Sequence, residues 1–81
     1  DNRAGNYEKS IADARAALRL RPDYAEAYNN IAAACASLGQ WDNAIAAATK
    51  AVRLKPGFQL AKNNLAWAES EKARAAGASH P

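Results

Sequence analysis

The sequence predicts an all-α protein, a solenoid of antiparallel helix hairpins, and three observations support this prediction. The chain matches itself when it is shifted by 34 residues. Within each period, apolar residues recur at steps of three and four, as one face of an α-helix requires. Glycine and proline recur at the positions where those helices would end. A period of this length is typical of a solenoid, in which each unit buries its apolar face against its neighbours.

The internal match extends from Gly5 to Ala66 and includes polar as well as apolar positions. The matched pairs include Gly5 with Gly39, Tyr7 with Trp41, Ile11 with Ile45, Leu20 with Leu54, Pro22 with Pro56, Tyr24 with Phe58, Asn29 with Asn63 and Asn30 with Asn64. The period predicts about four helices, divided into a half repeat at 5–24, one complete repeat at 25–58 and a capping helix at 59–75.

The first helix is expected at about 6–20, and it places Tyr7, Ile11, Ala14 and Leu18 on one face. This face matches the second helix of a repeat whose first helix is absent, so we expect the chain to be the C-terminal part of a longer array. Without a preceding helix the four residues would form an exposed apolar patch, and such patches tend to find partners. They therefore predict self-association of the isolated chain as a homodimer.

The second and third helices are expected at about 24–38 and 42–54 and should form the central hairpin. Gly39 suits the left-handed cap of a helix, and Asp42 is suited to opening the next one. Pro56 cannot continue the third helix, so the chain should turn there.

The fourth helix is expected at about 58–75 and should close the stack. Lys62 and Glu69 stand where Tyr28 and Cys35 stand one period earlier, so charged residues occupy the face that would meet a following helix. This difference indicates a solubilising cap. The helical domain is then expected to span 1–76, and the parent protein should end nearby. Residues 77–81 break the helical pattern and are expected to form a disordered tail.

The central unit resembles a tetratricopeptide repeat, a family with a 34-residue period and the pattern W-x2-L-G-x2-Y…A-x3-F…P. Tyr28 stands at the motif tryptophan, Ile31 at the leucine, Ala32 at the glycine, Cys35 at the tyrosine, Ala44 at the second alanine and Pro56 at the proline. Cys35 and Ala48 are small where the family is usually aromatic, so we expect closer helix packing with less buried area. The resemblance implies the fold specifically and the function only broadly, because this fold serves very many partners.

Two equivalent helical stripes supply the candidate partner-binding residues, because in the family this stripe lines a concave groove. The candidates are Asn30, Ala33, Ser37, Leu60, Asn64 and Trp67. Asn30 and Asn64 resemble the asparagine ladder by which some helical repeats hold the backbone of an extended peptide, since an amide can both donate and accept. The alternative is that both asparagines are solvated, or bonded near the start of each helix.

Trp67 lies outside the shared packing face, so an exposed indole could anchor an apolar side chain of a partner. The alternative is that it packs against the tail or the preceding helix. The clamp that some family members use for a terminal carboxylate is not matched, because Asn29 and Ala33 stand where its lysine and asparagine would be.

No catalytic, cofactor or metal site is predicted, and we expect no enzyme activity from this chain itself. Cys35 lies on an apolar helical face with no histidine near it in sequence, which favours a buried structural thiol. His80 stands alone in the tail, and one histidine with one cysteine cannot assemble a zinc site. No glycine-rich phosphate loop or Ser/His/Asp arrangement is present.

Composition argues against nucleic-acid and membrane partners. The net charge is +3, but 11 Lys and Arg are interspersed with 8 Asp and Glu, whereas nucleic-acid binding needs clustered cations. No apolar run approaches the length of a membrane span. The first residues lack the layout of a secretory signal, and a single cysteine leaves the compartment undetermined. A cytoplasmic location is slightly favoured over others.

These observations predict a protein-interaction scaffold that receives an extended peptide in a concave groove. Two alternatives remain open. The chain could be an accessory domain that recruits substrates to a larger enzyme or regulates it, because asparagine ladders occur in proteins resembling O-linked glycosyltransferases. It could instead be a self-assembly module, which the concentration dependence of its size would distinguish.

Overall fold

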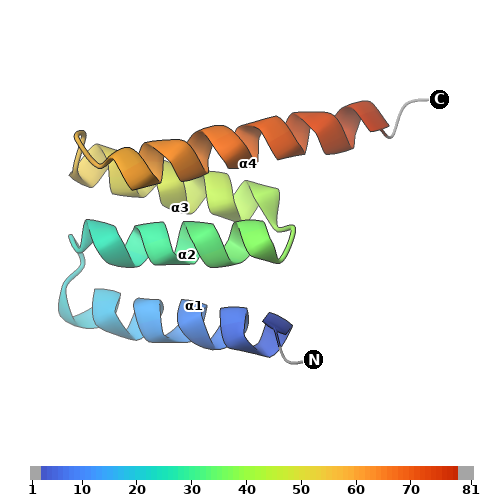
Figure 1. The fold of residues 1–81 in the computed structure, drawn as a ribbon. Helices are drawn as coiled ribbons and strands as arrows, with labels where there is room; N and C mark the ends of the chain where they lie inside the picture. Colours follow the sequence, from blue (N-terminus) through green and yellow to red (C-terminus); the bar gives the residue numbers. More distant parts are fainter. Residues whose placement is uncertain (1–2, 79–81) are drawn as a thin grey trace.

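Four antiparallel α-helices form the protein in the computed structural model, which describes residues 3–78. The helices are α1 (Arg3–Leu20), α2 (Ala25–Ser37), α3 (Trp41–Leu54) and α4 (Gln59–Ala78). They stack in chain order, and no strand occurs within the described part of the chain (Figure 1). The prediction of an all-α stack of helix hairpins is confirmed.

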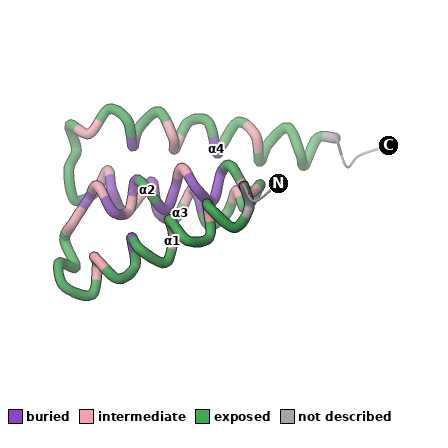
Figure 2. Tube along the Cα trace, turned by 60° about the horizontal axis from the view of Figure 1, so that its bottom comes forward, coloured by how far each residue is buried: buried purple, intermediate pink, exposed green. Residues whose placement is uncertain are grey.

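α2 is the centre of the stack. It packs against α1 on one side and α3 on the other, and it also contacts α4 directly. Over residues 3–78, α1 makes close contact with α2 alone. Buried residues therefore concentrate along α2 and α3, while α1 and α4 are mostly exposed (Figure 2).

The turn between α2 and α3 follows the sequence prediction. Gly39 adopts the left-handed conformation with φ 77°, which glycine accepts without steric cost. The backbone N–H of Gln40 donates to the carbonyl oxygen of Cys35 at 2.8 Å, which closes the end of α2. α3 begins at Trp41, so Asp42 lies in its first turn, where a carboxylate is favoured by the helix dipole.

The core consists almost entirely of small side chains. Ala32, Ala48, Ala51 and Ala61 are fully buried, and the largest fully buried side chain is that of Cys35. Small residues allow helix backbones to approach closely, but each contact removes little apolar area from water. The stack is therefore held by many weak contacts rather than by a few large anchors.

The exposed apolar patch predicted on α1 is absent. Ala14 is only 6% exposed, Ile11 and Leu18 pack against the core, and Tyr7 is half-buried. These side chains are covered because this face of α1 lies against α2. The prediction of a bare patch was wrong, and the homodimer remains a prediction without an exposed patch to support it.

The end of α4 also differs from the sequence prediction. The helix continues to Ala78, so the first residues of the predicted tail at 77–81 are helical, and the rest lie outside the described residues. Alanines between 73 and 78 explain the extension, because alanine has the highest intrinsic helix propensity. Lys62 and Glu69 are exposed on α4, and the capping role of this helix stays a prediction. None of the described helices is long and apolar enough to cross a membrane.

Candidate functional site

The predicted partner-binding residues come from α2 and α4, which lie side by side. On α2, Asn30 and Ser37 are exposed and Ala33 is half-buried. On α4, Leu60 is 62% exposed and Trp67 is 44% exposed. Two large apolar side chains, seven residues apart, are therefore exposed on α4, and polar side chains are exposed on α2, which α4 contacts.

The two asparagines of the expected ladder are in different environments. Asn64 is half-buried, and its Nδ2 donates to Oδ1 of Asn29 at 2.7 Å. Asn29 is itself buried, at 9% exposure. Asn30, one period before Asn64, is exposed, and its side-chain amide makes no hydrogen bond within residues 3–78. Only Asn30 thus has its whole amide available to a partner, while Asn64 uses one N–H to join α4 to α2.

Trp67 is partly held by the preceding helix. Its ring meets that of Trp41 on α3 edge-on, with 6.0 Å between ring centroids and an interplanar angle of 70°. This arrangement is favoured for aromatic pairs. The alternative of packing against the preceding helix is confirmed, and the role of Trp67 as a partner anchor stays a prediction for an indole that is still 44% exposed.

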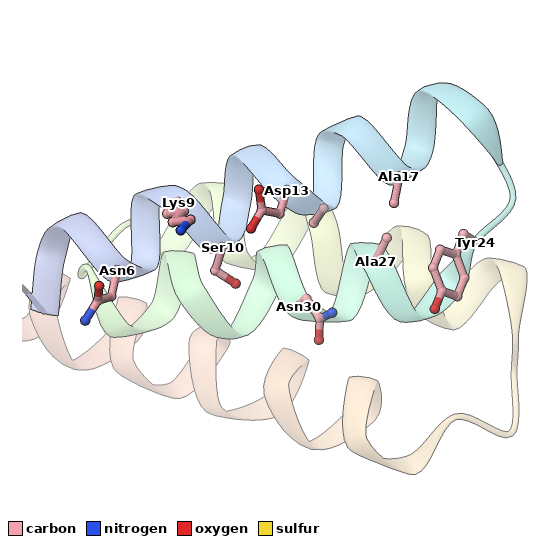
Figure 3. Close-up of a pocket in the computed structure, with 9 residues that line it drawn as sticks. Asn6, Lys9, Ser10, Asp13, Ala17, Tyr24, Ala27 and Asn30 are labelled. Carbon is pink, nitrogen blue, oxygen red and sulfur yellow. The ribbon is translucent and has the colours of Figure 1, made fainter.

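A groove between α1 and α2, here named the α1/α2 groove, is lined by polar side chains together with Ala14, Ala17, Tyr24 and Ala27, and its wall on α1 was not predicted. Its larger hollow has a volume of 340 Å³ and is lined by Asn6, Lys9, Ser10 and Asp13 from α1 with Asn30 from α2 (Figure 3). A second hollow of 200 Å³ shares Ser10 and Asn30 with it and extends to Ser37. Ala33 lines this second hollow as well, so all three predicted residues of α2, Asn30, Ala33 and Ser37, form part of the wall of the groove.

The internal repeat contains a signal for this groove. Ser10 and Asp13 stand 34 residues before Ala44 and Ala47, which are 1% and 8% exposed in the core. Polar residues on α1 thus replace core alanines on α3. Sequence reasoning did not compare these two positions and so did not find the groove.

A family model for the tetratricopeptide repeat matches residues 3–57, well over half of the chain. The chain belongs to the tetratricopeptide repeat family. The match spans α1, α2 and α3 and ends before α4, which is related to α2 through the internal period. Tetratricopeptide repeats generally mediate protein–protein interactions and are typically non-catalytic scaffolds. No curated protein matches the sequence of the chain.

The positions assigned to the tetratricopeptide motif are packing positions in the structure. Ile31, Ala32, Cys35 and Ala44 are all buried, and Tyr28 is half-buried. These motif positions therefore account for much of the core, Pro56 in the turn after α3 is exposed, and the six predicted partner-binding residues lie outside the motif.

Ion pairs between helices hold the exposed faces in place. Lys55 Nζ donates to Oε2 of Glu26 at 3.0 Å, and this hydrogen bond lowers the pKa of the Glu26 carboxyl. Lys72 of α4 pairs with Asp42 of α3. In the part of the chain that the structure describes, no cluster of His, Cys, Asp or Glu could hold a metal ion.

Proposed function

We propose that this tetratricopeptide chain holds an extended segment of a partner protein across α2 and α4. The observation that supports this most directly is the pair of exposed apolar side chains on α4, Leu60 and Trp67. Few large apolar residues are so exposed here, and such residues are typical anchors of protein interfaces. The exposed Asn30 and Ser37 beside them provide polar groups for the backbone of the segment.

Trp67 suits this role because its ring is already fixed. The edge-on contact with Trp41 limits the orientations of the indole before a partner arrives. A side chain that is ordered in advance loses less conformational entropy on binding. The partner would then contact the free face of Trp67, with Leu60 two turns earlier on α4 as a second contact.

Asn30 is the amide that we assign to the peptide backbone. It can donate to a carbonyl and accept from an N–H together, which allows recognition without a strict sequence requirement. Its side chain has no hydrogen-bond partner within residues 3–78 and lines the α1/α2 groove. The segment would therefore continue from Trp67 and Leu60 toward this groove.

A peptide selected from a displayed random library on the full chain provides the test. Leu60→Ala with Trp67→Ala should weaken its binding about tenfold or more, since buried aromatic anchors dominate interface energies. Lys62→Ala with Glu69→Ala is the matched control, with the same spacing on the opposite side of α4. Asn30→Ala should also weaken binding while the melting temperature is unchanged. Fluorescence anisotropy measures each affinity, and equal affinities for both double variants would contradict the proposal.

A further inference from the structure

Another hollow, separate from the α1/α2 groove, lies between α1 and α3 with α2 as its floor, and we name it the α1/α3 cleft. Its volume is 510 Å³, within the range of ligand pockets in proteins. It shares no lining residue with the α1/α2 groove, and α4 contributes none. The cleft exists because α1 and α3 both pack on α2 without close contact to each other.

Most residues of the floor and walls of this cleft are apolar, and Asn43 of α3 is the polar side chain among them. Cys35 and Ile31 of α2 form the floor and are 2% and 7% exposed, while Leu18 and Tyr28 form half-buried walls. Cys35 stands at the tyrosine position of the tetratricopeptide motif. A thiol is much smaller than a phenol ring, so the floor lies deeper than a tyrosine would leave it.

The rim of the cleft is positively charged. Arg15 from α1 and Lys50 from α3 are exposed, and no carboxylate lines the cleft. Within residues 3–78 neither cation has an ion-pair partner. The α1/α2 groove differs, because Lys9 and Asp13 both line it. Burial raises the pKa of the Cys35 thiol, and the positive charge of Arg15 opposes part of that rise, so Arg15 acts electrostatically on the floor of the cleft.

We propose that the α1/α3 cleft is a second protein-docking site, which takes an acidic segment of a partner. One apolar side chain enters over Cys35 and Ile31, and carboxylates on either side of it pair with Arg15 and Lys50. Burial of the side chain provides affinity, and the two cations select against neutral or basic segments. This site is separate from the groove of the proposed function and does not depend on it.

A protein segment fits the cleft better than a membrane does. The apolar surface is recessed between two helices, where a single side chain can enter, whereas a bilayer requires an apolar face that projects from the protein. The two cations stand on opposite walls of the recess instead of forming a basic stripe. This placement matches carboxylates that flank an apolar residue on one strand of chain.

The test uses the full 81-residue chain and a short fluorescein-labelled synthetic peptide in which glutamates flank a central leucine. Arg15→Glu with Lys50→Glu should weaken binding about tenfold or more. Lys62→Glu with Arg74→Glu is the control, because it changes the net charge equally at exposed sites of α4, which contributes no residue to the cleft. Ala46→Trp should fill the cleft from an exposed position and weaken binding similarly, while Ala46→Ser should not.

Each outcome decides the proposal. Loss of affinity in the Arg15/Lys50 and Ala46→Trp variants, with little change in both controls, supports it. Equal loss in the Lys62/Arg74 control would show attraction to net charge alone and would overturn it. Absence of binding at about 1 mM peptide, the weak limit of specific recognition, would also overturn it. The proposal would also be overturned if the chain bound phosphatidylserine vesicles more tightly than the peptide and Ala46→Trp left the vesicle binding unchanged.

Discussion

α1 and α3 occupy the same place in the repeat but have different surroundings. α3 packs against α2 and α4, whereas α1 packs against α2 alone. Ala44 and Ala47 of α3 are buried in the core, whereas Ser10 and Asp13, the equivalent residues of α1, line the α1/α2 groove. The same position in the period is therefore core in one helix and groove lining in the other. Neighbouring helices, and not the position alone, decide which residues remain available to a partner.

Exchanging equivalent residues between α1 and α3 should produce the largest difference in the free energy of unfolding. Ala47→Asp places a carboxylate at a site that is only 8% exposed and should lower the free energy of unfolding by about 2 kcal/mol or more. Asp13→Ala, the reverse change at the equivalent position of α1, should alter it by less than about 0.5 kcal/mol. Urea denaturation followed by circular dichroism measures both. Similar losses in the two variants would show that the two faces are equivalent after all.

A smaller effect is expected at Ile11, which packs against the core from α1. Ile11→Glu should cost about 1 to 2 kcal/mol and lower the melting temperature by several degrees in a chain of this length. Lys9→Glu, two residues earlier and exposed, is the control. Sedimentation should show the same mass for parent and variant, because Ile11 faces α2. A parent dimer that Ile11→Glu converts to a monomer would instead support self-association through α1.

The smallest difference in stability is expected between alanine variants of the two equivalent asparagines, Asn30 and Asn64. Asn64→Ala leaves Oδ1 of Asn29 without its donor and should cost about 1 kcal/mol. Asn30→Ala should leave stability within about 0.5 kcal/mol of the parent, since Asn30 is exposed. Chemical denaturation of the two single variants, side by side, tests the difference. A larger loss for Asn30→Ala would mean that its amide is needed for folding.

The fold could be predicted from the sequence because the period and its punctuation are local signals. Gly39 has the expected left-handed conformation, and helix starts and ends follow the 34-residue repeat closely. The end of α4 was placed too early, because residues 77 and 78 were assigned to a tail although the preceding alanines favour helix.

The site could be predicted only in part, because exposure depends on the relative placement of helices. The exposed positions of Leu60 and Trp67 follow from helical periodicity on α4. The contact of Trp67 with Trp41 and the bond of Asn64 to Asn29 depend on how α4 sits against α3 and α2. No pattern of spacing along one helix contains that information.

The alanine core has a thermal consequence. Heat capacity rises on unfolding in proportion to the apolar surface that becomes exposed, and alanines such as Ala32, Ala48 and Ala61 expose little each. The heat-capacity increment should therefore be low for a chain of this size. A low increment gives a broad, shallow curve of stability against temperature, so cold should weaken this protein little and its unfolding on heating should be gradual.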